Sequence, residues 1–454
     1  MEIKSQVVVI GAGPAGLNAA KYAANSGCEV ALIDAGVRLG GQYWRNTGDE
    51  KFDQSVHQDF DNAILLMEAV RANPRIKIYS GVSIWSASIL NDEIVLRSAD
   101  GAFITQRLIL ATGAFDRSIP FPGWDIPGVM TAGAAQSLLK GNRTLAGKNI
   151  VVGGTGPFLL PVATGLLEQG ATSVQLIEAS HALAWAPQLH ILLQNPKKIF
   201  DALSYFSTLR RYGVSMKYRR AIVRATAGED GSLKSVTVAT INANFEILST
   251  IEVPCDVAAI SWGFTPDTAL ATSLGLPARI AIDGSATIKA DDDQLALEIG
   301  GCKIFVAGEL TGVGGSELAL LEGAIAGLSV AGARASTRTL RKLRRRARRF
   351  AEVLYKVYQI PSGWKSWLTP ETIICRCEEV PYEALNSARD QLGAVDARAM
   401  KLMTRCGMGM CQGRVCSRNV FDLLESTDRD RLRGSERPII TPITLGELAQ
   451  EGLL

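Results

Sequence analysis

The sequence predicts an α/β protein with Rossmann-like domains, and three observations lead to this prediction. Apolar strand segments run straight into a glycine-rich turn and a helix twice, near residues 7–24 and again near 149–167. Units of this kind build parallel sheets that are covered by helices. The third observation is that five of the eight cysteines lie between Cys375 and Cys416. Such crowding predicts metal or cluster ligands rather than disulfides.

The first unit begins with Val7–Ile10, a fully apolar and β-branched run typical of a strand buried on both faces. Gly11 permits the tight turn that follows, and Gly13 lets a pyrophosphate approach the backbone. Gly16 lets the next helix pack close to the strand. The candidate phosphate-binding turn therefore consists of Gly11, Ala12, Gly13, Pro14, Ala15 and Gly16.

A second strand, Val30–Ile33, ends at Asp34, 18 positions after Gly16 of the turn. A carboxylate at this position suits a ribose hydroxyl and repels a 2′-phosphate. The N-terminus of the intervening helix supplies free N–H groups and a positive dipole end for the phosphates. Strand, turn, helix and acid together predict an adenine-dinucleotide site.

Three later segments extend this site in the manner of two-domain flavoproteins. Gly40-Gly41-Gln42 has the composition of a segment that runs beside the flavin, and Ala111-Thr112-Gly113 is a turn typical of flavin enzymes. A strand then ends in Gly308-Glu309, where such flavoproteins carry Gly-Asp and place the carboxylate on the ribityl chain. Glu309 is one methylene longer, so we expect an altered contact. Gly312, Gly314 and Gly315 precede a helix whose N-terminus is expected at the flavin pyrimidine edge.

The second unit repeats the pattern with one change. Gly154 and Gly156 match the first two glycines, but Leu159 stands where the third is expected. The next strand ends in Glu178, again an acid suited to a ribose. Because Leu159 is expected to push the helix away from the strand, a nicotinamide-domain fold is predicted while dinucleotide binding at Gly154, Gly156 and Glu178 stays open.

The composition fits a cytoplasmic enzyme. A chain of 454 residues suggests about three domains, and the net charge of +3 gives no argument for nucleic acid binding. We expect no signal peptide and no membrane span. The basic run Arg341–Arg349 is interpreted as a solvated linker helix or a protein-partner face, with a buried stripe at Phe350, Leu354 and Tyr358.

The C-terminal cysteines form the pattern Cys375-Arg376-Cys377, followed by Cys406, Cys411 and Cys416. Four thiolates suit a [2Fe–2S] cluster or a structural zinc. Cys-x-Cys spacing is unusual for zinc, which favours the cluster. Gly407, Gly409 and Gly413 would free N–H groups for the cluster sulfurs. From spacing alone, Cys406 is a fifth candidate ligand.

These motifs together resemble a known family. The chain is similar to the A subunit of opine (octopine and nopaline) oxidases and the B subunit of hydrogen cyanide synthase. It also resembles the α subunits of heteromeric sarcosine oxidase and dye-linked proline dehydrogenase. The matching segments cover nearly the whole chain and are Gly11–Gly16, Gly40–Gln42, Ala111–Gly113, Pro120–Leu139, Cys375–Glu378 and Thr404–Cys416.

The resemblance implies a two-dinucleotide-binding-domain flavoprotein followed by a bacterioferritin-associated-ferredoxin-like [2Fe–2S] domain. The implied ligands are Cys375, Cys377, Cys411 and Cys416, since relatives usually carry Ala where Cys406 stands. The expected domains are 1–120 with 255–335 for FAD or another adenine nucleotide, 121–254 for an NAD(P)-like fold, 336–370 for the basic helix and linker, and 371–454 for the cluster.

The resemblance also implies partners. A separate β subunit is expected to hold the FAD that oxidises the amine, FMN is expected at the subunit interface, and a small γ subunit is a further option. Among relatives the adenine site holds FAD, NAD or ATP. A quinone or another respiratory acceptor is compatible with this scheme. His57, His181 and His190 are scattered and form no general-base pattern, so no catalytic residue is assigned.

Three functions follow as hypotheses. The leading one is a flavin and iron–sulfur electron-transfer subunit of a heteromeric dehydrogenase or oxidase for an N-substituted amino acid, such as an opine, sarcosine or proline. The second is a self-sufficient NAD(P)H-dependent reductase, favoured if Gly154 and Gly156 bind a dinucleotide. The third is a mainly structural subunit that a nucleotide stabilises.

Overall fold

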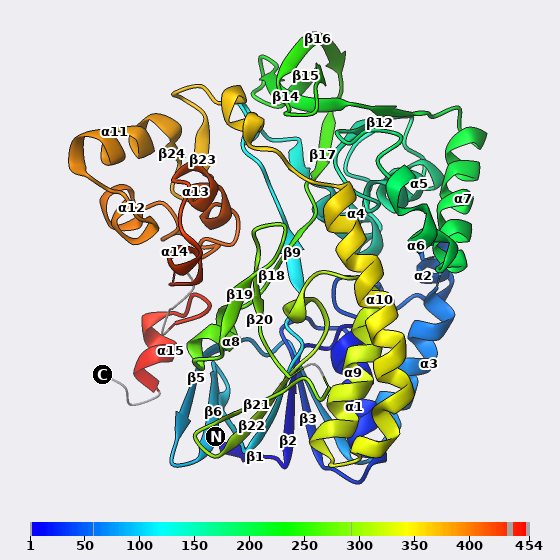
Figure 1. Ribbon diagram of the computed structural model, residues 1–454, viewed down its shortest axis with the longest axis vertical. Coiled ribbons are helices and arrows are strands. Elements are labelled where there is room, and N and C mark those ends of the chain that lie inside the picture. The colour runs from blue at the N-terminus through cyan, green and yellow to red at the C-terminus, as the bar shows by residue number, and fades with distance from the viewer. Residues whose placement is uncertain (1, 58, 292, 434–438, 451–454) are drawn as a thin grey trace. The chain divides into compact units, whose positions relative to one another are not determined.

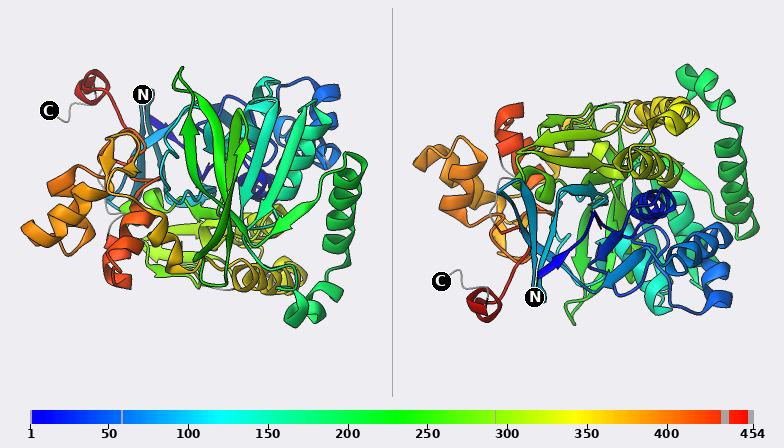
Figure 2. Two further views of the ribbon diagram at one scale, coloured as in Figure 1. Left: turned by 90° about the horizontal axis from the view of Figure 1, so that it is seen from above. Right: turned by 90° about the horizontal axis from the view of Figure 1, so that it is seen from below.

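The computed structural model describes residues 2–57, 59–291, 293–433 and 439–450, and the chain divides into two compact units (Figures 1 and 2). Unit 1 comprises Met1–Phe115, Thr265–Ala351 and Ser435–Leu454. Unit 2 comprises Asp116–Phe264 and Glu352–Gly434. Among the described residues, no helix combines the length and apolar character needed to cross a membrane.

Unit 1 is built on a six-stranded sheet whose strands are parallel except for the edge strand β21. Val7 and Val9 of the central strand enter the core on one face, and Val8 and Ile10 enter the core on the other. Burial on both faces is why this strand is apolar throughout. The strand order is β21 (Ala296–Ile299), β22 (Cys302–Val306), β8 (Arg107–Leu110), β2 (Val7–Ile10), β3 (Val30–Asp34) and β4 (Ile76–Ser80).

Helices cover one face of this sheet, and a smaller sheet covers the other. The helices are α1 (Pro14–Asn25), α3 (Phe60–Arg71) and α9 (Ser316–Val330), and the smaller sheet has the order β1 (Glu2–Lys4), β7 (Gly101–Thr105), β6 (Glu93–Ser98) and β5 (Ile84–Leu90). Gly323 lets α9 lie against α1, because a Cβ there would be 2.1 Å from the carbonyl oxygen of Ala15. Unit 1 also contains α2 (Glu50–Val56), α8 (Ala269–Ser273), β19 (Ala278–Ile280), β20 (Ala286–Ile288) and α15 (Leu445–Gln450).

Unit 2 repeats the layered arrangement on a five-stranded, fully parallel sheet. Its order is β10 (Val129–Thr131), β17 (Val257–Ser261), β11 (Asn149–Gly154), β12 (Ser173–Glu178) and β13 (Met216–Tyr218). One face packs on α4 (Ala132–Asn142), α5 (Leu159–Glu168) and α7 (Pro196–Arg211). The other packs on an antiparallel sheet of β14 (Arg220–Ala227), β15 (Leu233–Ile241) and β16 (Ile247–Pro254). The predicted pair of Rossmann-like α/β folds is confirmed.

The cysteine-rich segment lies in unit 2 and has a small core of its own around Ile374, Leu385, Met400 and Val420. Its elements are β23 (Ile373–Cys375), β24 (Val380–Pro381), α11 (Tyr382–Leu392), α12 (Ala397–Thr404), α13 (Ser417–Leu423) and α14 (Asp428–Arg433). The preceding linker is anchored because the indole N–H of Trp367 donates to the carbonyl of Phe245 at 2.9 Å.

The basic run forms part of α10 (Arg338–Val357), but it is not simply solvated. Within unit 1, Glu322 of α9 is fully buried and lies 2.8 Å from Arg344 Nε and 2.7 Å from Arg348 Nη2. Glu322 also accepts hydrogen bonds from the Gly308 N–H and the Thr311 hydroxyl. Two of the arginines therefore fix the helix to α9, since a buried carboxylate requires charged and hydrogen-bonding partners.

Candidate cofactor sites

The first candidate site is the turn between β2 and α1, and its glycines are sterically required. Gly11 has φ +99°, and a Cβ there would lie 2.2 Å from the Ala111 carbonyl oxygen. A Cβ on Gly16 would lie 1.6 Å from the Gly11 carbonyl oxygen. The turn and the first turn of α1 are thus as closely packed as the sequence predicted.

Gly13 is different, because the space beside it is open. An added Cβ would meet only the Cα of Gly41, at 4.0 Å, so the backbone borders a free cradle. Gly13 is also the N-cap of α1, which begins at Pro14. The first N–H groups of a helix have no partner within it, and the positive dipole end favours an anion there. The cradle fits the pyrophosphate of an adenine dinucleotide.

Asp34 lies beside this cradle at the end of β3. Its carboxylate accepts hydrogen bonds from the N–H groups of Ala12 and, at 2.6 Å, Gly36. Burial raises the pKa of Asp34, while these two amides act in the opposite direction. Both carboxylate oxygens are thus bonded within the turn, but Asp34 is only half-buried, at the strand end where this class of fold recognises a ribose.

The residues expected on the flavin side have partners within unit 1. The Glu309 carboxylate accepts from the N–H groups of Gly314 at 2.9 Å and Gly315 at 3.0 Å. The extra methylene lets the side chain turn back onto the loop before α9, instead of pointing outward as the ribityl expectation required. Burial raises the pKa of Glu309. The Gly308 N–H is likewise used by Glu322.

The other two flavin-side segments are also placed. The Thr112 hydroxyl donates to the Asp267 carbonyl at 2.7 Å, and Gly113 has φ +75°. Gln42 is exposed and accepts from Arg45 Nη2 at 2.6 Å, next to Gly41, whose own Cβ would come within 2.8 Å of Gly13. The structure therefore brings Gly13, Gly41 and Asp34 to one turn, with Thr112 and Gly308 on neighbouring strand ends.

The second candidate turn, between β11 and α5, begins with the same geometry as the first turn but has a different helix start. Gly154 has φ +132°, and a Cβ there would lie 1.8 Å from the Ser261 carbonyl oxygen. The helix, however, begins only at Leu159, whereas α1 begins at the residue that corresponds to Pro157. The intervening turn is tightened by bonds of the i to i−3 type, from Leu159 N–H to Gly156 and from Leu160 N–H to Pro157. Leu159 itself is fully buried in the core.

The Glu178 carboxylate is directed into the second turn and is bonded there to groups of the protein. It is 2% exposed, and it accepts from the Thr155 hydroxyl at 2.6 Å and from the Gly156 and Ser180 N–H groups at 3.1 and 2.8 Å. Burial raises its pKa. A carboxylate with three internal donors serves the loop, so its predicted role toward a ribose lacks geometric support.

An aromatic pair near Glu178 was missed from the sequence. Trp185 donates its indole N–H to the Tyr358 hydroxyl at 3.1 Å, and the two rings pack edge to face at 6.2 Å. Burial raises the pKa of Tyr358, and the charges of Glu178 and Tyr218 add to this. The pair lies near the carboxyl end of β12, where dinucleotides bind in this class of fold. The residues are far apart in sequence, so no local signal could have paired them.

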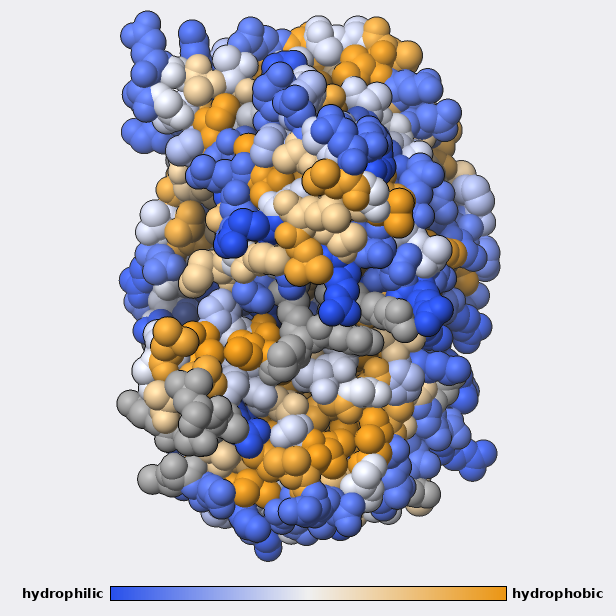
Figure 3. Space-filling model, turned by 90° about the vertical axis from the view of Figure 1, so that its left-hand side faces the viewer, coloured by the Kyte–Doolittle hydropathy of each residue, from blue (hydrophilic) through white to orange (hydrophobic). Residues whose placement is uncertain are grey.

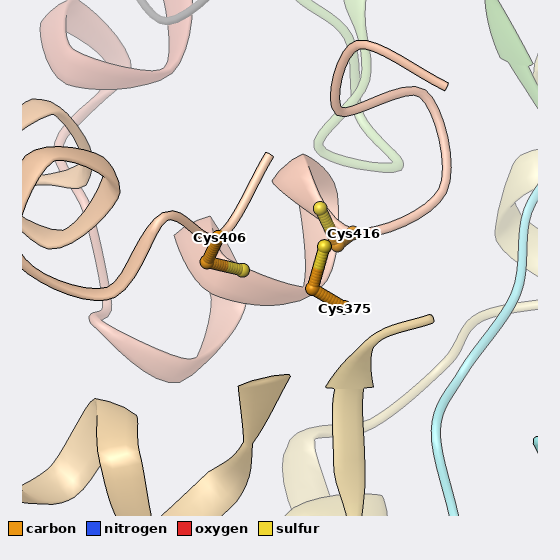
Figure 4. Close-up of side chains that lie close together, drawn as sticks. All are labelled: Cys375, Cys406 and Cys416. Carbon is orange, nitrogen blue, oxygen red and sulfur yellow. The ribbon is translucent and has the colours of Figure 1, made fainter. Parts of the chain in front are cut away.

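The third candidate site gathers all five C-terminal cysteines. The sulfurs of Cys375, Cys406 and Cys416 lie within 4.8 Å of one another and point toward a common centre (Figure 4). Cys377 Sγ is 3.9 Å from Cys375 Sγ and 3.7 Å from Cys411 Sγ. The first three thiols are buried, Cys411 is half-buried and Cys377 is exposed. Hydrogen bonds from the neighbouring thiols lower the pKa of Cys411 to about 5.

The surrounding residues fit a metal or cluster. A Cβ on Gly409 would lie 2.6 Å from Cys377 Sγ, and Gly407 and Gly413 adopt positive φ, so the expected glycines do shape this loop. Arg405 pairs with Glu378 at 2.8 Å, and Arg376 lies over the Trp124 ring. Five converging thiols form a soft donor set suited to iron or zinc.

The comparisons with known proteins agree with these folds. Residues 5–331 match the model of the pyridine nucleotide-disulphide oxidoreductase family, so the chain belongs to that family and is an oxidoreductase. Membership implies FAD binding, and the open cradle at Gly13 fits the adenosine diphosphate part of FAD.

Particular relatives match over almost the whole chain. The A subunit of opine oxidase from Rhizobium meliloti is 31% identical over 97% of this chain and 98% of its own length. Hydrogen cyanide synthase subunit HcnB of Pseudomonas protegens is 30% identical over 95% of this chain and 94% of its own. The crystal structure of L-proline dehydrogenase from P. horikoshii has the same fold, with a TM-score of 0.69, 21% identity, and coverage of 98% of this chain and 80% of that one. The suspected relationship is confirmed.

Proposed function

We propose that this chain is the flavin and iron–sulfur electron-transfer subunit of a heteromeric dehydrogenase or oxidase for an N-substituted amino acid. The observation that carries the proposal is the convergence of five cysteine sulfurs in a chain that also holds an open dinucleotide cradle. A nucleotide site alone would serve many oxidoreductases, whereas a thiol cluster adds a one-electron relay.

The cluster is assigned to Cys375, Cys377, Cys411 and Cys416. The short spacing of the first pair and the 3.7 Å between Cys377 and Cys411 support ligation of one small centre. When bound, a [2Fe–2S] cluster would supply one-electron transfer. The protein's part is to bury Cys375 and Cys416 while leaving Cys377 exposed, so that one edge of the centre stays close to solvent or to a partner.

The first site is assigned to FAD. Gly11, Gly13 and Gly16 form the cradle, the N-terminus of α1 faces the pyrophosphate, and Asp34 is placed for the ribose. When bound, FAD would supply the exchange between two-electron and one-electron chemistry. Glu309 holds the loop before α9 and so sets the shape of the flavin side. NAD or ATP at this site is the competing outcome.

The structure favours the relay over a self-sufficient NAD(P)H reductase. In the second turn, Leu159 delays the start of α5, Glu178 is satisfied internally, and the Trp185–Tyr358 pair lies nearby. The late helix start and the use of the Gly156 N–H by Glu178 remove contacts that a second dinucleotide would need. NAD(P)H is therefore not expected to be the electron donor.

A partner subunit is expected to oxidise the amine. Two relatives that match over almost the whole chain are themselves named as subunits, of opine oxidase and of hydrogen cyanide synthase. His57 stacks on Phe60, and the exposed His181 accepts from the Leu183 N–H, so neither contact pairs a histidine with another catalytic group. Outer-sphere electron transfer needs no general base in this chain. A β subunit with its own FAD, FMN at the interface and an optional γ subunit complete the proposed assembly.

The surface beside the cysteines suits such a partner. Met410 is 76% exposed and stands next to Cys411, and Leu402 and Met403 of α12 are also exposed. The side of the molecule that carries α11 and α12 shows hydrophobic residues among hydrophilic ones (Figure 3). Exposed apolar groups beside an exposed ligand thiol favour docking of another redox protein.

Co-expression with the partner subunit followed by spectroscopy tests the proposal. The purified chain should contain about two iron and two acid-labile sulfide, together with flavin absorbance. Amine substrate should reduce this chain only when the partner is present, with flavin bleaching before the cluster. Stoichiometric zinc without sulfide, or amine oxidation by this chain alone, would contradict the assignment.

A further inference from the structure

The cysteine site holds one more thiol than a [2Fe–2S] cluster requires. The additional thiol, Cys406, lies among the other sulfurs. Cys406 Sγ lies within 4.8 Å of both Cys375 Sγ and Cys416 Sγ, and Figure 4 shows its side chain directed at them. Cys377 and Cys411, at 3.7 Å, make a more exposed pair, and Cys377 Sγ also lies 3.9 Å from Cys375 Sγ of the buried group. The donors therefore divide into a buried triad, Cys375, Cys406 and Cys416, and an exposed pair.

The loop around Cys406 holds this thiol in place. Arg405 ends α12 in the left-handed conformation at φ 64°, and Gly407 follows at φ +89°. The Cys406 N–H donates to the Thr404 hydroxyl at 3.2 Å. The residue is 5% exposed, so it is not a surface thiol that merely happens to lie in the segment. A fixed, buried sulfur among ligand sulfurs is placed as a ligand would be.

We propose that Cys406 is a reserve ligand for the buried half of the cluster, which can replace Cys375 or Cys416 when either is lost. The inference rests on the cluster assigned under the proposed function. Each iron of a [2Fe–2S] centre takes two cysteine thiolates. The buried triad offers three thiols for two positions, whereas the exposed pair has no substitute among the described residues.

The exchange is a ligand substitution and requires no oxidant. Cys406 would lose its thiol proton to solvent, and its sulfur would take the iron position of the lost cysteine, displacing the solvent molecule that otherwise fills it. Neither the iron nor the sulfide changes oxidation state. The exposed pair cannot be rescued in this way, because Cys406 lies with the buried triad.

Matched single and double variants of the full chain test the proposal. Cys416→Ala should retain most of the iron and sulfide of the wild-type protein, and its reduced cluster should show shifted EPR g-values. Cys406→Ala should have wild-type content and an unchanged spectrum. The double variant Cys406→Ala/Cys416→Ala should lose the cluster. Cys411→Ala should lose it although Cys406 is present.

Bound nucleotide and circular dichroism report whether each variant is folded. If Cys416→Ala does not accumulate, Cys416→Ser keeps the side-chain size. Resonance Raman then distinguishes coordination by four sulfurs, expected if Cys406 takes over, from coordination by the serine oxygen, which would overturn the proposal. A folded Cys416→Ala without iron overturns it as well. A wild-type chain without iron and sulfide would instead refute the cluster itself.

Discussion

The two nucleotide turns of this chain have almost the same sequence outline and different structures. In unit 1 the helix starts immediately after the second glycine, the space beside Gly13 is open, and Asp34 borders it. In unit 2 the helix starts two residues later, at Leu159, and Glu178 is buried within the loop. The same fold thus leaves an open space beside the turn in unit 1 and a turn closed by its own carboxylate in unit 2.

The two turns differ in two respects together: the residue at the third-glycine position, and the burial and bonding of the carboxylate that ends the next strand. Gly16 allows α1 to press against the turn, so its first N–H groups face the phosphate position. With Leu159 in the equivalent place, the side chain joins the core and the first turn of α5 tightens. The Gly156 N–H, which would face a phosphate, then bonds to Glu178.

The largest expected effect is the loss of nucleotide from unit 1 on Gly13→Val. The added side chain would occupy the cradle, and its Cβ would meet Gly41 Cα only at 4.0 Å. We therefore expect a folded protein without bound flavin, measured by the absorbance of the purified chain and its melting temperature. Full flavin content in this variant would show that the site lies elsewhere.

The acid of unit 2 should matter for stability and not for cofactor binding. Glu178→Ala leaves the Thr155 hydroxyl and the Gly156 and Ser180 N–H groups without their acceptor. We expect a loss of about 3–5 kcal/mol in the free energy of unfolding, with unchanged flavin content. Denaturant titration measures the first quantity. If Glu178→Ala lost flavin but little stability, the turn of unit 2 would be a cofactor site, which contradicts the assignment.

A buried carboxylate also gives unit 2 a pH dependence. Burial raises the pKa of Asp116 to about 6, and the Thr131 hydroxyl donates to it at 3.0 Å. Since the folded-state pKa exceeds the unfolded value, its contribution to stability is present at low pH and is lost as pH rises through about 6. The full difference is about 3 kcal/mol. Asp116→Asn should flatten the stability profile between pH 4 and 7, measured by denaturant unfolding at each pH.

The smallest expected effect is that of the acid in unit 1. Asp34→Ala removes the group placed for the ribose, so flavin binding should weaken by about 1.5–3 kcal/mol, or roughly 10- to 150-fold. Equilibrium titration of the apo chain with FAD measures this change. Glu178→Ala is the matched control, and an equal loss of affinity in both variants would erase the distinction between the turns.

The sequence predicted the parts of the site that local patterns determine. The strand Val7–Ile10, the glycine turns and the cysteine cluster each depend on neighbouring residues or on strongly restricted spacing. The backward turn of Glu309 could not be predicted, because it depends on where Gly314 and Gly315 present their N–H groups.

Long-range contacts account for the remaining surprises. The Trp185–Tyr358 pair and the bond from Arg348 to Glu322 join segments whose separation in sequence carries no pattern. The family resemblance left Cys406 out of the predicted ligand set, although its place among five crowded cysteines was already a signal. Glu322 stands within an otherwise apolar, small-residue helix, which was a sequence sign that this acid would be buried and would need a cationic partner.

The most direct test of the contrast between the two units is the reaction of the isolated chain with NADH. The chain, loaded with flavin and cluster, is mixed anaerobically with NADH or NADPH and its visible spectrum is followed. Because the second turn is closed by Leu159 and Glu178, we expect only slow and incomplete bleaching, with rapid reduction only when amine and the partner subunit are supplied. Rapid, complete bleaching by NADH alone would contradict the account and identify the chain as a self-sufficient reductase.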